Sequence, residues 1–296
     1  MPFNSDNKIV QQLLWPVMAL LLIVSWSSGF VGIRYANDHA SVSLVLFWRT
    51  FISGLILLPF ALLMGPRMTL KGIARQMVFG AMVVFLYLGG FSLAIAKGVP
   101  TGLVALISDL VPLAIAGLSQ PLLNERLSGK QWLGTAIAIA GVVLVSWHSL
   151  AIGTAPVWAY GLTIGSMLVF ALATVLQKSM GALSMPLHQT LSIQFLTGAM
   201  LFAIATAFDG GLSVPTEGAF WFGIAWLVLI ATFLCYSIYY TSLRLYPASR
   251  VSATIYLSPP VTMIWAWALF NEPLTVTTFV GLGITMVGVW LTAAKG

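Results

Sequence analysis

Long apolar runs separated by short polar joints extend along almost the whole chain. A helical run of about 20 apolar residues covers roughly 30 Å, which is the thickness of the hydrocarbon core of a bilayer. The joints carry helix breakers such as Gly65-Pro66 and Asp209-Gly210-Gly211. The pattern predicts an all-α membrane protein with ten transmembrane helices, at residues 14–33, 43–64, 74–96, 101–122, 131–149, 157–178, 187–208, 218–241, 248–270 and 275–294.

The second half of the chain repeats the first at an offset of 147 positions. Under this shift the following residues coincide: Pro100 with Pro247, Pro112 with Pro259, Asn124-Glu125 with Asn271-Glu272, Gly134 with Gly281, and Gly141 with Gly288. Such a repeat in a membrane chain indicates a duplicated bundle whose binding site lies between the copies. We expect residues 1–149 and 150–296 to form two repeats of five helices each around a central cavity.

The distribution of basic residues predicts the orientation, because cytoplasmic loops hold an excess of Lys and Arg. With a cytoplasmic N-terminus, the outer ends of the spans hold only Arg34 and Lys97. The inner ends then hold Lys8, Arg67, Lys71, Arg75, Arg126, Lys130, Lys178, Arg244, Arg250 and Lys295. Both termini are therefore expected in the cytoplasm. Because five spans is an odd number, the second repeat starts from the opposite side, so the repeats are predicted to be inverted, a geometry that suits alternating access.

The composition removes several classes of protein from consideration. Charged residues make up 7% of the chain, against roughly 25% in soluble domains, which excludes a soluble fold. The net charge of +6 comes from scattered basic residues, so we expect the lipid bilayer and no nucleic acid as a partner. The single cysteine, Cys235, permits no intrachain disulfide, and no two histidines lie at metal spacing. We expect no metal and no cofactor, and a first span that is retained because no small-residue cleavage site follows a short apolar core.

Several short motifs resemble those of the EamA-type transporters of the drug/metabolite transporter superfamily. They are Trp26 to Phe30, Phe47 to Arg49, Asn124 to Leu127, Gly134 to Gly141, Asn271 to Leu274 and Gly281 to Gly288. The resemblance covers nearly the whole chain, and within the superfamily the first span, the length and the aromatic content look most like the bacterial exporters of aromatic amino acids. It implies export of aromatic and other neutral amino acids across the bacterial inner membrane, through a cavity lined mainly by spans 1, 3, 4, 6, 8 and 9.

Asp109 departs from the small or apolar residue that this family usually has in the middle of span 4. It lies on the order of 12 Å below the outer surface at 1.5 Å per residue. A carboxylate at that depth costs at least ~2.5 kcal/mol, so it is a candidate functional residue. It could pair with a substrate ammonium group, couple transport to protons, or be a structural residue bonded to a neighbour such as Ser108 or Tyr256. The repeat places Tyr256 at the position equivalent to Asp109.

Pro112 in span 4 and Pro259-Pro260 in span 9 lie deep in their predicted helices, where proline removes a backbone hydrogen bond and frees a carbonyl. We expect kinks or breaks at these places. Freed polar groups at matching depths in both halves indicate a substrate site, although packing kinks have the same signature.

Aromatic residues supply further candidates for the pathway. Tyr87 in span 3, Tyr236, Tyr239 and Tyr240 in span 8 could stack on an aromatic substrate, while Tyr239 and Tyr240 could instead be interfacial anchors. Trp26, Ser27 and Ser28 in span 1 could form a wall or gate, or could simply pack, with the serines bonded to their own backbone.

Three charged residues are interpreted as structural. Arg49 lies about seven residues inside span 2 and could snorkel or pair with a helix end. Glu125 and Glu272 lie at matching turns and could cap the helix that follows each of them.

The glycines of spans 5 and 10 are spaced for close helix contact, within one chain or between two, so the protein is expected to be a monomer or a homodimer.

These features favour a small-molecule transporter. The sequence has no HExxH, no Gly-x-Ser-x-Gly and no clustered Arg or Lys for a phosphate group, which argues against an enzyme and against a sugar-nucleotide carrier. The duplication argues against a purely structural role. An exporter of neutral amino acids is the leading hypothesis, and the alternative is a drug/metabolite exporter of lipophilic cations, for which Asp109 and the tyrosines would be suitable.

Overall fold

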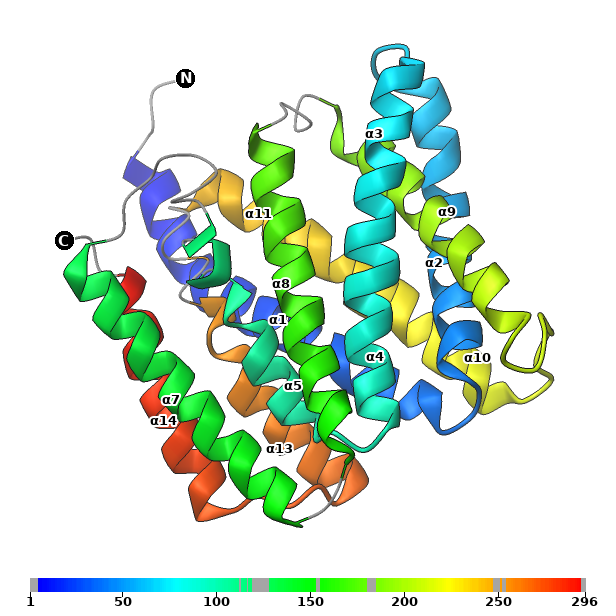
Figure 1. Cartoon of the computed structure of the whole chain (residues 1–296). Coiled ribbons are helices and arrows are strands. Elements are labelled where there is room, and N and C mark those ends of the chain that lie inside the picture. The colour runs from blue at the N-terminus through cyan, green and yellow to red at the C-terminus, as the bar shows by residue number, and fades with distance from the viewer. Residues whose placement is uncertain are drawn as a thin grey trace.

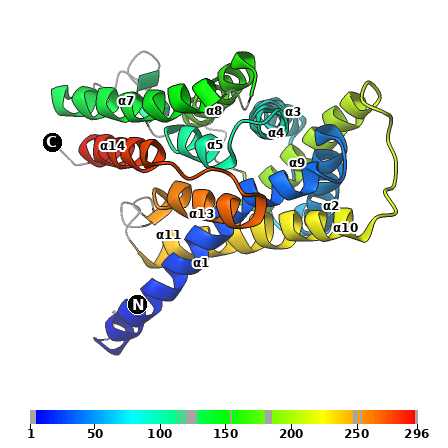
Figure 2. The ribbon, with the colours of Figure 1, turned by 90° about the horizontal axis from the view of Figure 1, so that it is seen from below.

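Apolar helices, joined by short turns at Gly and Pro, form the bundle that the computed structural model of this chain shows (Figures 1 and 2). The structure describes residues 5–111, 113–115, 117–118, 128–152, 155–179, 185–246, 251 and 254–293. All regular elements within these residues are helical: α1 (Ser5–Asn37), α2 (Val42–Leu63), α3 (Leu70–Gly80), η1 (Ala81–Leu88), α4 (Gly89–Ala96), α5 (Thr101–Ser108), α7 (Gly129–Ile152), α8 (Val157–Ser179), α9 (Leu187–Thr206), α10 (Gly218–Ala225), η3 (Trp226–Leu234), α11 (Cys235–Leu245), α13 (Ser258–Phe270) and α14 (Val276–Ala293).

Seven helical stretches in the described part of the chain are long and apolar enough to cross a membrane. They are Leu14–Asn37, Val42–Leu63, Leu70–Ala96, Gly129–His148, Val157–Gln177, Leu187–Thr206 and Gly218–Ser242. These correspond to predicted spans 1, 2, 3, 5, 6, 7 and 8. The other three predicted spans correspond to shorter helices, and two of those are interrupted near the middle of the predicted span.

The two interruptions lie at equivalent places in the repeat. In the first half, α5 ends at Ser108 and a turn follows at Asp109 and Leu110. In the second half, a turn at Tyr256 and Leu257 precedes α13. The sequence had suggested that Pro259 and Pro260 lie deep inside a helix. They stand instead at the first positions of α13. Proline is tolerated there because the first N–H groups of a helix have no partner within it.

A second matched irregularity lies in predicted spans 3 and 8. Each contains a π-helical stretch, η1 (Ala81–Leu88) and η3 (Trp226–Leu234). A shift of 147 positions lays η3 over residues 79–87, so the two stretches nearly coincide. π-Helical turns are rare in proteins, and those that do occur are often found at functional sites. Because the same deviation occurs in both halves, the space beside η1 and η3 is a candidate location for a functional site.

Equivalent helices pair with each other at both edges of the bundle. α7 lies along α14 at one side and α2 lies along α9 at the other, as both views show (Figures 1 and 2). The α2–α9 pair is antiparallel: Ser43 Oγ donates to Asp209 Oδ2 at 2.8 Å, Ser192 Oγ to the carbonyl of Gly54 at 3.3 Å, and Gln189 Nε2 to the carbonyl of Ala61 at 3.1 Å. The two halves are therefore joined along two seams.

The α7–α14 seam consists of glycines in close contact. A Cβ atom on Gly141 would lie 2.6 Å from the carbonyl oxygen of Gly281, and one on Gly288 would lie 2.5 Å from that of Gly134. Both distances are far shorter than a van der Waals contact, so the backbones touch where side chains would keep them apart. The glycine stripe predicted for spans 5 and 10 is used within this chain.

We predict that Gly281→Ala destabilises the bundle, since the added methyl would meet Val145 Cγ2 and, at 2.8 Å, the carbonyl oxygen of Gly141. Overpacking of this kind costs about 1–3 kcal/mol. The midpoint of thermal unfolding in detergent should fall by several degrees.

The matched control is Gly283→Ala on the same helix, where an added Cβ has no atom within 4 Å. This variant should unfold at the wild-type temperature or slightly above it, because alanine is the better helix former by about 1 kcal/mol. Equal unfolding temperatures for the two variants would contradict the glycine seam.

Candidate functional site

A cavity of about 150 Å³ lies between the two halves, beside the π-helical stretches. The elements that line it are α1, α2, η1 and α4 from the first half and α8, α9, η3 and α11 from the second. The lining residues are Trp26, Gly29, Phe30, Arg49, Val83, Val84, Tyr87, Leu88, Phe91, Phe170, Leu191, Gln194, Phe195, Ala231, Cys235 and Tyr236. In membrane proteins built from internal repeats, binding sites commonly lie at the interface between the repeats, so this cavity is the candidate site.

Aromatic rings form a large part of the wall. Tyr87 packs against Phe170 with ring centroids 4.6 Å apart and against Phe91 at 5.1 Å. Phe91 in turn lies 5.3 Å from Phe30. Rings at these separations make favourable tilted contacts with each other and present flat apolar surfaces to a ligand. The wall suits an apolar or aromatic group.

Arg49 is the charged residue of this wall. Its Nη2 donates to Thr232 Oγ1 at 3.3 Å, and the Thr232 hydroxyl itself donates to the carbonyl of Leu227 in the π-helical stretch. The other terminal nitrogen, Nη1, is buried without a hydrogen-bond partner. The sequence suggested a structural role for Arg49, and the structure places it at the cavity.

Asp109 lies in the turn that follows α5 and is not among the residues that line the cavity. Its Oδ2 is buried without a hydrogen-bond partner. It interacts electrostatically with two tyrosines, Tyr87 of the cavity wall and its repeat equivalent Tyr256. Tyr87 also interacts with the side chain of Ser108. The described residues form no ion pair between Asp109 and Arg49.

The three candidates of span 1 have different surroundings. Trp26 lines the cavity and lies 5.8 Å from the ring of Tyr239. Ser27 is fully buried and donates to the carbonyl of Ser258 at 3.1 Å, which ties α1 to the start of α13. Ser28 is also fully buried and donates to the carbonyl of Ser25 at 2.7 Å. Trp26 therefore faces the cavity, while the two serines make helix contacts.

The tyrosines of span 8 form a cluster at one end of the cavity. Tyr236 lines the cavity and stacks on Tyr240 at 6.3 Å. Tyr239 and Tyr240 are half-buried and lie 5.1 Å apart. Tyr239 reaches the cavity indirectly, through its contact with Trp26.

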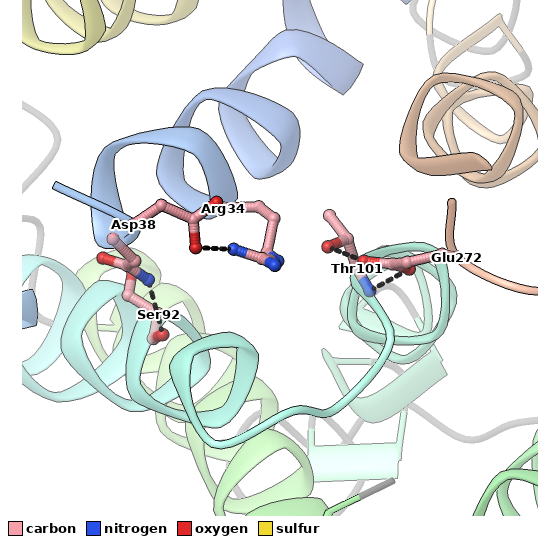
Figure 3. Close-up of polar contacts among 6 residues, drawn as sticks. Arg34, Asp38, Ser92, Thr101 and Glu272 are labelled. Atoms are coloured by element: carbon pink, nitrogen blue, oxygen red, sulfur yellow. Dashed lines mark hydrogen bonds and ion pairs between the residues drawn. The ribbon is translucent and has the colours of Figure 1, made fainter. Parts of the chain in front are cut away.

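Residues at successive turns of α1 lead from the cavity to a polar cluster. Trp26, Phe30 and Arg34 follow one another at intervals of four residues on α1, and Asp38 comes directly after the helix ends at Asn37. Arg34 pairs with Asp38 (Figure 3). Its guanidinium group also lies over the ring of Phe270, 5.0 Å from the ring centroid. This arrangement puts the cluster roughly 12 Å along α1 from Trp26.

Glu272 completes the polar cluster and fastens the two halves together. Its Oε2 accepts from the backbone N–H of Thr101 at 2.8 Å and its Oε1 from the Thr101 hydroxyl at 2.6 Å (Figure 3). Thr101 begins α5, so Glu272 caps a helix of the other half. The sequence had suggested that it caps α14, the helix that follows it. Arg34 interacts electrostatically with the same carboxylate.

Some expectations need correction and others lie outside the described residues. Among the described residues, those of predicted spans 2 and 7 line the cavity in place of spans 4 and 9, because the turns at Asp109 and Tyr256 leave α5 and α13 packed against each other and against α1. Pro112 and Glu125 lie outside the described residues. His, Cys, Asp and Glu side chains of the described segments form no group of three that could hold a metal ion.

Sequence reasoning missed the position of Arg49 in the cavity wall and the role of Thr232 as its partner. A signal was present in the repeat, since Arg49 coincides with Leu196 and Thr232 with Phe85 under the 147-residue shift. Polar residues that a duplicated scaffold does not share are candidates for the site. The phenylalanines of the wall, Phe30, Phe91 and Phe170, carried no signal that separates them from other apolar residues of their helices.

Apolar membrane-length helices that surround a cavity with aromatic walls define a multi-pass membrane protein with an internal cavity. The model of the "EamA-like transporter family" matches the chain twice, over residues 13–147 and 157–294. The chain therefore belongs to the EamA-like transporter family.

Relatives over nearly the whole length have names of transporters rather than enzymes. An "Uncharacterized transporter" of Archaeoglobus fulgidus is 26% identical over 284 residues, 95% of this chain and 99% of its own. A "Probable amino-acid metabolite efflux pump" of Escherichia coli (strain K12) is 26% identical over 93% of each chain. A "Probable terminal-alkyne amino-acid exporter" of Streptantibioticus cattleyicolor is 26% identical over 93% of this chain and 92% of its own.

One solved crystal structure superimposes on 94% of this chain and 96% of its own with a TM-score of 0.63. The two sequences are 17% identical, so this likeness supports the fold alone.

We predict that Glu272 makes the stability of the protein depend on pH. Burial raises the pKa of the Glu272 carboxyl above 4.5, and the hydrogen bonds from Thr101 oppose that shift. The unfolded chain then releases this proton at a lower pH than the folded chain. Its contribution to stability is therefore fully present below pH 4.5 and declines as the pH rises through the raised pKa. Thermal unfolding of detergent-solubilised protein between pH 4 and pH 8 measures the decline.

Glu272→Gln removes the titrating group, so its unfolding temperature should change less with pH than that of the wild type. The control is Glu217→Gln, which removes an exposed carboxylate 3.7 Å from His39. If both variants followed the wild-type profile, Glu272 would not be the source of the pH dependence.

Proposed function

We propose that this protein exports aromatic and other neutral amino acids, or close derivatives of them, across the bacterial inner membrane. The observation that carries the proposal is the cavity between the halves, whose walls are mainly apolar, with many aromatic rings, and contain a single described charge, Arg49. Flat apolar walls suit an aromatic or aliphatic side chain. A positive charge among them suits the carboxylate that every amino acid carries.

The relatives support the same substrate class. Two of those with near full-length similarity are named for amino-acid metabolite efflux or for export of an amino acid. At 26% identity such names describe those proteins. We extend them to this chain because its cavity combines apolar walls with one positive charge, which suits an amino acid. The proposal that aromatic side chains are accepted rests on the ring contacts of Tyr87, Phe91 and Phe170.

We further propose ten spans arranged as two inverted repeats, with both termini in the cytoplasm. The contacts of the α7–α14 seam support it, since Gly141 meets Gly281 while Gly134 meets Gly288. The 147-residue shift turns each of these contacts into the other, as a pseudo-two-fold axis between antiparallel helices requires. Inverted repeats permit transport by alternating access, because each repeat can take up the conformation of the other.

The polar cluster of Arg34, Asp38, Thr101 and Glu272 serves in this proposal as the gate on the outer side. It links α1 and α5 of the first half to the turn after α13 of the second. Phe30 and Phe91 close the same end of the cavity one turn deeper. Opening to the outside would require the bonds between Glu272 and Thr101 to break.

Asp109 is proposed as the acid that couples transport to protons. A carboxylate at this depth costs roughly 2.5–3.5 kcal/mol. Its Oδ2 has no hydrogen-bond partner, and the ion pairs that the described residues form do not include Asp109. Such a group takes up a proton or faces water during part of a transport cycle. Its electrostatic interaction with Tyr87 couples it to the cavity wall, and that with Tyr256 couples it to the other half.

A lipophilic cation is a poorer fit to the cavity. The aromatic walls would accept one through cation–π contact. Arg49 stands in the same wall with no anionic partner among the described residues, so a second positive charge would be repelled there. This repulsion is why amino-acid export is the preferred function.

We predict saturable flux of radiolabelled tryptophan and phenylalanine into proteoliposomes that hold the purified protein. Threonine should be carried more slowly, since its side chain cannot fill the aromatic wall. Ethidium and methyl viologen should not compete. Liposomes without protein provide the background, and transport of the two cations without any amino-acid flux would overturn the proposal.

We predict that Asp109→Asn abolishes the response of tryptophan flux to an imposed pH gradient while tryptophan binding is retained. Asparagine has nearly the same shape but cannot exchange a proton, so coupling is the property that it removes. The comparison uses counterflow, which needs no driving force, as the control for a folded carrier. Flux that responds to the gradient in Asp109→Asn as in the wild type would make Asp109 a structural residue.

A further inference from the structure

We infer that Arg49 is the substrate's carboxylate-binding residue and so determines that this carrier selects molecules with an apolar or aromatic body and a carboxylate. The inference rests on the proposed function and extends it from a substrate class to a specific contact. It comes from the one described cation in the cavity wall, whose hydrogen-bonding capacity is only partly used.

The guanidinium group is held in place but not neutralised. Thr232 accepts a hydrogen bond from Nη2 at 3.3 Å, which fixes one side of the group. Nη1 is buried and has no partner. A guanidinium offers five N–H donors in a planar fork, so the bond to Thr232 uses only part of the hydrogen-bonding capacity of Arg49. A carboxylate accepts two such bonds in parallel.

The surroundings of Arg49 contain no competing anion. Its electrostatic contacts are with Tyr236, Cys235 and Tyr87, all of them residues of the same cavity. The ion pairs that the described residues form are Arg34 with Asp38 and His39 with Glu217, and neither pair includes Arg49. An unpaired buried cation costs several kcal/mol. An anionic ligand in the cavity would offset that cost, which an apolar or cationic ligand cannot do.

Gln194 is the one side-chain amide among the lining residues, and it is already engaged. Gln194 Nε2 donates to Gln76 Oε1 at 2.8 Å, in a contact between α9 and α3 that is buried on both sides. Ring edges and apolar side chains make up most of the rest of the lining. A ligand that binds here therefore has one strong polar anchor, at Arg49, and an apolar surface for its body.

The repeat shows that this anchor belongs to one half alone. The position equivalent to Arg49 is Leu196, and the residue equivalent to its partner Thr232 is Phe85. A guanidinium needed only to hold the scaffold would be expected at both seams of a duplicated bundle. Its presence in one copy gives the cavity a positive side and thereby orients a ligand.

The test measures binding to purified protein in nanodiscs, with radiolabelled tryptophan and with radiolabelled indole-3-propionate, which keeps the carboxylate and lacks the ammonium group. Tryptophanamide, which lacks the carboxylate, serves as a competitor. We expect wild type to bind tryptophan about 10- to 100-fold more tightly than tryptophanamide, the range for a hydrogen bond to a charged group. In Arg49→Gln this ratio should fall to about one, while tryptophanamide binds as before.

Two further variants keep the test independent of folding. Arg49→Lys retains the charge without the planar fork, and we expect it to keep part of the preference for the carboxylate. Arg67→Gln removes an exposed arginine outside the cavity and should behave as wild type. An Arg49→Gln protein that still prefers tryptophan over tryptophanamide by the wild-type ratio overturns the inference.

The two probes separate failure of this inference from failure of the proposed function. Binding of indole-3-propionate that depends on Arg49, with no binding of tryptophan, would support the carboxylate site and refute amino-acid export. Tryptophan binding that is insensitive to Arg49 would support export and refute the site. If neither probe bound to wild type while ethidium did, both would be refuted.

Discussion

Backbone contact between equivalent helices is the constraint on which the rest of this structure depends. At the α7–α14 seam the glycines bring two helices closer than any side chain would allow. At the α2–α9 seam hydrogen bonds from Gln189, Ser192 and Ser43 run from one half to the other. Lipid offers no hydrophobic drive for helices to associate, so close packing and such hydrogen bonds must hold the halves together. With both edges joined, the helices between them can enclose a cavity.

The irregular backbone follows from this arrangement. Within a bilayer, unpaired N–H and C=O groups are tolerated only where protein or an internal cavity surrounds them. The turns at Asp109 and Tyr256 and the π-helical stretches η1 and η3 lie in helices between the seams, and each stretch turns one side toward the interior, with Val84 and Thr232 buried. Each occurs in both halves at nearly the same register. The π-helical stretch η3 also has a direct consequence, because it contains Thr232, which holds Arg49.

The sequence predicted most of the scaffold and little of the wall of the cavity. Apolar length and breakers located α2 within one residue at each end, because a bilayer demands a fixed helix length. The same rule misjudged spans 4 and 9, since their interruptions at Asp109 and Tyr256 depend on tertiary packing. Glu272 was recognised at its turn, but its partner Thr101 lies 171 positions away in the chain and no local pattern indicates it. Arg49 looked structural for a similar reason: its surroundings come from helices of both halves.

Comparison of the two copies resolves part of that uncertainty, because duplication separates scaffold from site. Residues that form the seams are shared, as Gly134 with Gly281 and Gly141 with Gly288. Residues that give the interior its polarity are not: Arg49 coincides with Leu196, and Asp109 with Tyr256. A symmetric interior would hold two arginines or two aspartates in one low-dielectric space, where like charges repel strongly. With Arg49 in one half and Leu196 at the equivalent position in the other, that repulsion is absent and the cavity has one positive side. On the proposed function, a ligand with unlike ends would therefore bind in one orientation.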